Sequence, residues 1–419
     1  MPFMSRRQIL AGSAAGAGLA TIGSARRAAA QASGPIRIGY QLPLSGPVAN
    51  IGLQCKAGAE TAADYVNRNG GVLGRPVEIV FKDTKANPNE AVIAARELTS
   101  AGINLIGSGF IGFDILGSLP IIEETKSLAI SMTTVSMAVT HEKFSRRVFR
   151  QNSNDYQATS GAAAMAAARY PDVTVWGSIG YNAAATKDSV FNFQVQIEKA
   201  YARIGKKITL VEPMMMKIGT TDFKNEISSL MSQGVQGLFS EVYGEGGVTL
   251  FQQASSFGFS KQVKVIIDVG NEYAFARGMG KNIPNNFWAY THWNPAIYPN
   301  NVLGQALGRA YTERTKDPYP GQFLYYGSTP VLIFAAAIKA ANGSTDTDRL
   351  IDLLEGGLKV ETIQGPISFR KEDHAALGDL SFIKFDPIAT DPGFAVTDSV
   401  TIKGADVLEP ATPGVAFKF

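Results

Sequence analysis

Apolar positions follow two alternating patterns along this chain. Some short runs are apolar throughout or alternate between apolar and polar residues, which is the pattern of strands. Longer stretches lie between them, and in these the apolar residues recur every three or four positions, which is the pattern of helices. In the first half, strands are expected over 36–42, 77–81, 103–106 and 128–131, and helices over 54–68, from Asn87, and over 114–126. This alternation predicts a parallel sheet covered by helices on both faces.

The same alternation restarts after residue 150. A helix over 157–169 precedes expected strands at 173–176, 207–211, 237–240 and 263–267, with helices near 184–204, 222–233 and 247–257. Residues 294–356 are helical in pattern and contain no strand, so we expect them to pack back on the first half. The nine-residue apolar run 330–338 ends at Lys339 and predicts a buried helix, because a membrane span needs about 20 apolar residues.

Length and charge limit the class of protein. A chain of 419 residues with 45% hydrophobic and 18% charged residues predicts two globular domains. The net charge of +3 is misleading, because four of the 39 basic residues are arginines within residues 1–32, a segment without acids. The remainder has 35 basic and 36 acidic side chains, a net charge of −1. This balance argues against nucleic acid as a partner.

The first 32 residues have the pattern of an export signal. The twin-arginine sequence Ser5-Arg6-Arg7-Gln8-Ile9-Leu10 precedes an Ala/Gly-rich apolar run, and Ala30-Gln31-Ala32 supplies small residues for cleavage. We predict a cleaved twin-arginine signal peptide over 1–32; an uncleaved amphipathic helix is the alternative. The lone Cys55 cannot form an internal disulfide and lies too far from the leader for lipid attachment. It is expected to be buried, and the mature chain to be soluble in the periplasm.

One glycine motif raises the question of an enzyme. Residues 107–112 match G-x-G-x-x-G, the dinucleotide-binding fingerprint, after an expected strand. The match follows the third strand and not the first, and the next strand does not end in an acid. The histidines, His141, His292 and His374, are too far apart to predict a metal site. We therefore expect no enzyme activity, cofactor or metal, and keep an exported dinucleotide-dependent oxidoreductase as an alternative.

Two segments carry a family resemblance. Residues 43–47 read Pro-Leu-Ser-Gly-Pro, and residues 67–83 read NRNGGVLGRPVEIVFKD, a helix end, a glycine turn and a strand that ends in an acid. Together they resemble the branched-chain amino acid type of periplasmic binding protein, the solute receptor of an ABC importer. The resemblance implies a two-lobed α/β type I fold, with a mainly parallel sheet flanked by helices in each lobe and a three-stranded hinge. It places the first lobe at 36–154 plus 294–366 and the second at 155–293 plus 367–419, with crossings near 152–155, 290–294 and 364–369.

The ligand is expected beyond the carboxyl ends of the strands, where the two lobes of such a receptor face each other. The resemblance implies that Thr134 holds a ligand carboxylate, that an acid near Asp268 takes the ammonium, and that Tyr243 and Tyr181 cover the side chain. The predicted ligand-binding residues are Gly109, Phe110, Ile111, Met132, Thr133, Thr134, Tyr181, Tyr243 and Asp268.

Two departures from the family pattern affect the expected ligand. Ile111 occupies the position of a carboxylate-binding serine, and Asn50-Ile51-Gly52 lacks the usual tyrosine. Losing one charge-assisted hydrogen bond costs about 1.5–3 kcal/mol, or about ten- to hundredfold in affinity. We therefore expect an amino-acid-like or apolar or aromatic ligand that keeps one acid or amide end.

The predicted function is a monomeric substrate-binding component that delivers a small molecule to an ABC permease. A ligand-sensing regulator on the same fold is the alternative. The tail from residue 387 to 419 lies outside the resemblance, and the run 396–402 is expected to add an edge strand.

Overall fold

A five-stranded parallel sheet forms the centre of the first lobe. The computed structural model describes residues 34–46, 48–110 and 112–418. The strand order is β2-β1-β3-β4-β5. The strands are β1 (Ile36–Leu42), β2 (Val77–Asp83), β3 (Leu105–Ser108), β4 (Leu128–Ser131) and β5 (Val148–Arg150). The predicted signal peptide lies outside the described residues.

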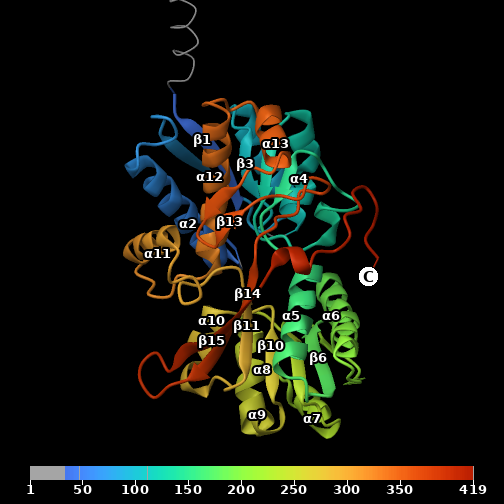
Figure 1. The fold of residues 1–419 in the computed structure, drawn as a ribbon. Coiled ribbons are helices and arrows are strands. Elements are labelled where there is room, and N and C mark those ends of the chain that lie inside the picture. The colour runs from blue at the N-terminus through green and yellow to red at the C-terminus, as the bar shows by residue number, and fades with distance from the viewer. Residues whose placement is uncertain (1–33, 47, 111, 419) are drawn as a thin grey trace, which may run out of the picture.

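An eight-stranded mixed sheet forms the centre of the second lobe (Figure 1). Its path is β15-β14-β11-β10-β9-β6-β7, and β8 also pairs with β6. The strands are β6 (Val175–Tyr181), β7 (Thr209–Leu210), β8 (Met214–Met216), β9 (Gly237–Glu241), β10 (Val265–Asp268), β11 (Phe287–Thr291), β14 (Leu380–Pro387) and β15 (Phe394–Ile402). Only the β11–β14 and β14–β15 pairs are antiparallel. The expected edge strand over 396–402 is confirmed as β15.

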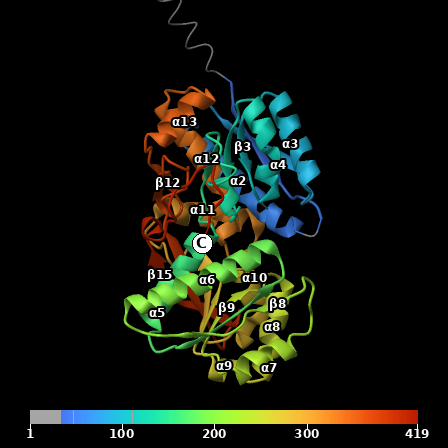
Figure 2. The same cartoon turned by 90° about the vertical axis from the view of Figure 1, so that its right-hand side faces the viewer.

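Helices flank both sheets (Figures 1 and 2). In the first lobe these are α2 (Ala49–Arg68), α3 (Pro88–Ser100), α4 (Phe113–Glu124), α11 (Val302–Thr315), α12 (Gln322–Ala340) and α13 (Thr347–Glu355). In the second they are α5 (Asp155–Arg169), α6 (Ala184–Arg203), α7 (Lys224–Ser232), α8 (Glu245–Ser256), α9 (Phe259–Gln262) and α10 (Tyr273–Met279). Short 3-10 turns lie at Met137–Val139, Gly280–Asn282 and Gly404–Asp406, and a two-stranded sheet pairs β12 (Val360–Thr362) with β13 (Gly365–Ile367).

Helix α12 packs directly on α2, which confirms that the helical region after residue 294 returns to the first lobe. Gly327 of α12 permits this close approach, because a Cβ there would lie 2.0 Å from the carbonyl oxygen of Cys55. Cys55 is buried, as expected. In the described part of the chain α12 alone is long and apolar enough to cross a membrane, but most of it is buried in the core of this lobe.

The segment over 67–83, which carries the family resemblance, has a structural role in the first lobe. Gly70 and Gly71 have φ values of 91° and 68°, the left-handed conformation that ends α2. Asp83, at the end of β2, accepts hydrogen bonds from the Leu44 backbone N–H (2.8 Å) and the Ser45 hydroxyl (2.6 Å). The acid therefore ties the Pro-Leu-Ser-Gly-Pro loop to the sheet.

The chain passes between the lobes after β5, after β11 and before β14 (Figure 1). Isolated bridges pair Ala375 with Arg150 and Ala376 with Phe369, so residues up to 376 still lie beside the first lobe. The second sheet begins again at Leu380. The exact lobe boundaries stay a prediction, and these pairings favour a third crossing near 376–380, later than the expected 364–369.

Candidate functional site

The carboxyl ends of the parallel strands of both sheets lie at the junction of the two lobes. Strand β5 leads from the first lobe into the second, and β11 leads back. Because β3 and β4 run parallel with β5, and β6, β9 and β10 run parallel with β11, all these strands end at the edge that faces the other lobe. The predicted binding loops follow these strands, so the topology places them on the two sides of one cleft.

In the first lobe the loops after β3 and β4 are bonded to each other. Gly109 has φ of 77°, and a Cβ there would lie 2.8 Å from the hydroxyl oxygens of Ser131 and Thr134. The Thr134 hydroxyl donates to the Gly109 carbonyl oxygen at 2.7 Å, and the Thr133 hydroxyl donates to the carbonyl oxygen of Phe110. These bonds occupy the carbonyl groups of Gly109 and Phe110 within the lobe itself.

In the second lobe two tyrosines form one wall of the cleft. The rings of Tyr181 and Tyr243 meet edge to face with centroids 4.9 Å apart. Tyr181 is buried at the end of β6, whereas 42% of Tyr243 is exposed. A Cβ at Gly246 would lie 2.0 Å from the Tyr181 hydroxyl oxygen, so only glycine fits in the first turn of α8 while the Tyr181 ring keeps this position. The exposed ring of Tyr243 is therefore available to a ligand.

Buried carboxyl groups line the same edge of the second lobe. Asp268, the last residue of β10, accepts hydrogen bonds from the Gly270 N–H at 2.9 Å and the Asn271 amide at 3.2 Å. Burial nevertheless raises the pKa of Asp268 to about 7. Glu241 ends the neighbouring strand β9, and burial raises the pKa of its carboxyl well above the ordinary value. Asp155, at the start of α5, has a pKa of about 7, also because of burial.

A cavity of about 670 Å³ opens between the lobes and is lined in part by Gly270 and Asn271, the hydrogen-bond partners of Asp268. The first lobe contributes Asn50, Ile51, Leu53, Gln54, Tyr311, Thr315, Asp317, Tyr319, Gly321, Gln322 and Phe323, and the second contributes Gly244, Asn271, Glu272, Tyr273, Ala274, Phe275, Arg277 and Gly270. Glu272 crosses the junction: its carboxylate accepts a bond from the Gln322 N–H at 3.2 Å, at the start of α12. The Arg277 guanidinium likewise bonds Asp317 of the first lobe at 2.8 Å.

The structure brings the predicted site residues together in two groups. One contains Gly109, Phe110, Met132, Thr133 and Thr134, and the other contains Tyr181, Tyr243 and Asp268. Ile111 lies outside the described residues. None of the predicted residues lines the large cavity, although Gly244 and Gly270, the neighbours of two of them, do. Their contact with ligand stays a prediction.

Three acids at the junction were not among the predicted ligand-binding residues. Glu241 did carry a signal, because it is an acid at the end of a strand. Asp155 and Glu272 had no such signal, because each follows a loop and its burial depends on the packing of the two lobes.

The histidines have structural roles, of which His292 is an example. His292 is buried at the second crossing, where its ring accepts from the Ser153 N–H at 2.8 Å and bonds the Tyr326 hydroxyl at 2.8 Å. Burial lowers its pKa to about 3. In the described part of the chain no three His, Cys, Asp or Glu side chains lie close enough together to hold a metal ion.

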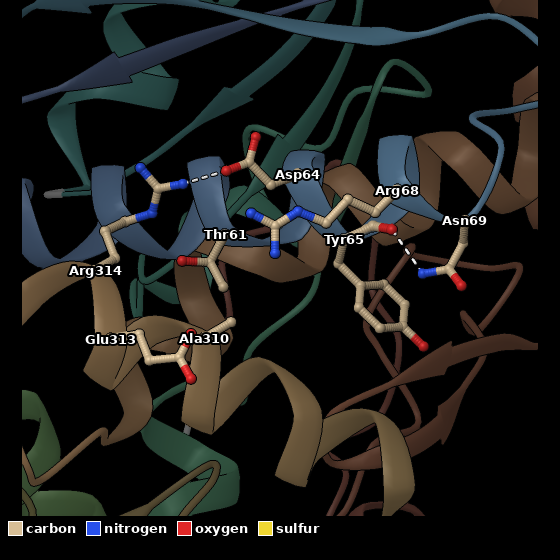
Figure 3. A pocket seen from close by; sticks show the side chains of 8 residues that line it. All are labelled: Thr61, Asp64, Tyr65, Arg68, Asn69, Ala310, Glu313 and Arg314. Carbon is tan, nitrogen blue, oxygen red and sulfur yellow. Dashed lines mark hydrogen bonds and ion pairs between the residues drawn. The ribbon is translucent and has the colours of Figure 1, made fainter.

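A second cavity, of about 360 Å³, lies away from the cleft, between α2 and α11 (Figure 3). Within its lining, Arg314 pairs with Asp64, and the Asn69 amide donates to the Tyr65 carbonyl oxygen at 2.8 Å. We assign no function to it.

Two α/β lobes, three chain crossings and a cleft at the strand ends define a two-lobed solute receptor with the type I periplasmic binding protein fold. The model of the periplasmic binding protein family matches residues 35–391, so the chain belongs to this family.

Named relatives and solved structures agree with that assignment. The leucine-, isoleucine-, valine-, threonine- and alanine-binding protein of Pseudomonas aeruginosa is 24% identical over 84% of this chain and 89% of its own length. The closed structure of the Brucella ovis protein of the same description superposes with a TM-score of 0.77, at 18% identity over 92% of this chain and 99% of that one. A Rhodopseudomonas palustris BisB5 solute-binding protein in complex with 3,4-dihydroxybenzoic acid has a TM-score of 0.71, at 19% identity over 88% and 98%.

Proposed function

We propose that this protein is the solute-binding component of an ABC importer and that it closes on one small molecule in the cleft between its lobes. The observation that carries the proposal is the placement of the ends of parallel strands from both sheets on the two sides of one junction. The family assignment supports a role in transport and a periplasmic location. The leader over 1–32 and the monomeric state remain part of the proposal.

The proposed mechanism is a population shift. A ligand that contacts both lobes at once stabilises the closed form, because those contacts exist together only when the cleft is shut. The permease then distinguishes the closed from the open form by surface shape. No covalent step is involved.

Two classes of ligand are compatible with the family. The Pseudomonas aeruginosa relative is named for aliphatic amino acids and threonine, whereas the Rhodopseudomonas palustris structure holds an aromatic acid. We propose an amino-acid-like molecule, or an apolar or aromatic carboxylate or amide, bound by Thr134 and Asp268 and covered by Tyr243. Phe110, Ile111 and Met132 are proposed as the apolar contacts, and Gly109, Thr133 and Tyr181 as the remaining ones.

A thermal-shift screen of amino acids, amines, aromatic acids and short amides tests the proposal. A true ligand at a hundred times its Kd adds about 2.7 kcal/mol of stability, enough to raise the melting temperature measurably. Small-angle scattering on the same samples should show a more compact particle with the stabilising ligand. A failure of every compound to stabilise or compact the protein would contradict the proposed function.

A further inference from the structure

The segment after β15 begins on the second lobe. The short 3-10 turn Gly404–Asp406 leads into residues 407–418, which have no helix or strand (Figure 1). Val407 is buried in the core of the second lobe with residues of α5 and β14. A Cβ at Gly404 would lie 1.9 Å from the Gly378 carbonyl oxygen, so the segment starts in close contact with the third crossing. All of it lies beyond the residues that match the family.

The same segment then reaches the first lobe. His141, which follows β4 and its 3-10 turn and is fully buried, is contacted from three positions. The Thr412 hydroxyl lies 2.7 Å from His141 Nδ1, and the Gly414 N–H donates to the His141 carbonyl oxygen at 2.7 Å. The ring of Phe417 packs on the imidazole with centroids 4.8 Å apart. Residues 412–417 are therefore anchored to the first lobe, although the chain enters them from the second.

Between these two ends, Glu409 joins the segment to two of the crossings. Its side chain is buried, and Oε1 accepts a hydrogen bond from the Asn154 amide at 2.5 Å. Asn154 caps the N-terminus of α5 at the first crossing. The Glu409 carbonyl oxygen accepts from the Arg370 guanidinium at 2.7 Å, and Arg370 lies before the third crossing. Pulling these groups apart is costly, because a buried carboxylate would lose a hydrogen bond.

Phe417 contacts both lobes at once. Its ring lies against His141 of the first lobe and, edge to face with centroids 5.5 Å apart, against Tyr156 of α5 in the second. Because His141 and Tyr156 lie on opposite sides of the first crossing, a rotation of the lobes changes the distance between them. Attraction between packed atoms falls off within about 1 Å of separation, so the ring keeps both contacts only over a narrow range of lobe orientations.

The three crossings by themselves allow the lobes to rotate, since only the torsions of a few residues have to change. The segment after β15 adds a fourth connection. It is covalently attached to the second lobe and anchored to the first by hydrogen bonds and ring contacts. A rotation of the lobes therefore has to break or displace these anchors.

We propose that residues 403–418 form a strap that restrains the rotation of the two lobes about their three crossings. The strap narrows the range of lobe orientations that the protein reaches without ligand. This restraint is a property of the chain alone, so it depends neither on the identity of the ligand nor on the proposed transport function.

Single-molecule fluorescence energy transfer between the lobes measures this restraint. Ser100 and Ser232 are exposed at the ends of α3 and α7, one in each lobe, and Ser100→Cys with Ser232→Cys provides two labelling positions. Cys55 is buried and should take up no dye, which labelling of the protein without the two new cysteines verifies. The full chain is measured without ligand. With the strap intact we expect a narrow distribution of transfer efficiencies.

Two variants weaken the strap at separate anchors. Phe417→Ala removes the ring that contacts both lobes, and Thr412→Val removes the hydroxyl beside His141. We expect each variant to broaden the distribution or to add a second population, and the double variant to do so more strongly. Val415→Ala, at an exposed position of the same segment, is the control and should give the wild-type distribution.

The outcomes separate a restraint on the lobes from a contribution to stability. Circular dichroism melting of each variant reports stability alone, and if one single variant does not fold, the other decides. A broader distribution in folded Phe417→Ala or Thr412→Val, beside an unchanged Val415→Ala, supports the strap. A lower melting temperature with the wild-type distribution would show that the segment only stabilises the fold, and would overturn the proposal. Equal broadening in the control would overturn it as well. A thermal-shift screen without any stabilising compound would contradict the transport function and leave this result unaffected.

Discussion

At the scale of single residues, the cleft is defined by which polar atoms are already used. The hydroxyls of Thr133 and Thr134 are bonded to the loop after β3, and Asp268 already accepts bonds from Gly270 and Asn271. The Oε2 atom of Glu241 is buried and has no hydrogen-bond partner among the described residues.

Thr134→Val tests the role of one hydroxyl. This change keeps the shape of the side chain but removes the 2.7 Å bond to Gly109, so we expect a loss of about 1–2 kcal/mol of stability. If Thr134 also contacts the ligand, affinity should fall about tenfold in titration calorimetry. Unchanged affinity beside reduced stability would show that Thr134 only holds its own loop.

At the scale of elements, the segment after β15 links the two lobes again. The Gly414 N–H donates to the His141 carbonyl oxygen at 2.7 Å, and the ring of Phe417 packs on His141 and on Tyr156 of α5. Glu409 is buried here, where it accepts from the Asn154 amide at 2.5 Å and lies 3.4 Å from His141 Nε2. This segment follows the residues that match the family, so its docking is a feature of this chain beyond the matched region.

Glu409→Gln tests the contribution of this segment. Burial raises the pKa of Glu409, but the contact with His141 and the charge of Arg150 outweigh burial and leave the pKa below its ordinary value. The variant leaves the buried Arg150 without this counterion, so we expect a loss of about 3 kcal/mol in denaturant unfolding near neutral pH.

The control for this prediction is Asp406→Asn, an exposed acid on the same segment, which should unfold as the wild type does. The wild-type advantage over Glu409→Gln should shrink as the pH falls below the ordinary glutamate pKa, because the carboxyl is then protonated. Equal stability of the variant and the wild type at neutral pH would contradict this account of the segment.

At the scale of the whole molecule, the junction of the lobes concentrates buried ionisable groups. Asp155, Asp268 and Glu272 each have a pKa of about 7 because of burial, and that of Glu241 is raised as well. Burial lowers the pKa of His292 to about 3, and that of His374 is also lowered. Without ligand, these carboxyl groups at the cleft therefore keep their protons at a higher pH than carboxyl groups in the unfolded chain do.

These groups predict a dependence of stability on pH. Between the ordinary carboxyl pKa and about 7 the folded protein binds more acid protons than the unfolded chain, so stability falls as the pH rises through this range. The two histidines act in the opposite direction below about pH 6.5, but the four acids outnumber them. Without ligand, the melting temperature should be higher at about pH 5.5 than at about pH 7.5.

The double variant Glu241→Gln and Asp268→Asn should lose much of this difference, because two of the four acids no longer titrate. Differential scanning calorimetry of both proteins across this range measures the effect. A wild-type melting temperature that rises steadily towards pH 7.5 would show that these carboxyls are ionised in the empty cleft.

The sequence by itself determined the fold class, most of the parallel strands and the helices between them, the buried α12 and the edge strand β15, but it did not predict β5, β11 or β14. It determined the former features because the periods of strand and helix, the glycine turn at 70–71 and the Asn87 cap are local signals. It also predicted that the candidate binding loops follow strand ends and meet at one edge, since parallel strands share that edge; their contact with ligand stays a prediction.

Only the tertiary structure decided which acids at that edge are shielded from solvent. Asp155 follows the first crossing and Glu241 ends a strand, about 85 residues apart in the sequence, and their shared environment arises when α5, α6 and β9 pack together. The sequence also did not predict that the last segment contacts His141, because these contacts join residues about 270 positions apart. Local patterns specify elements, whereas the burial of a charge depends on what the whole fold places around it.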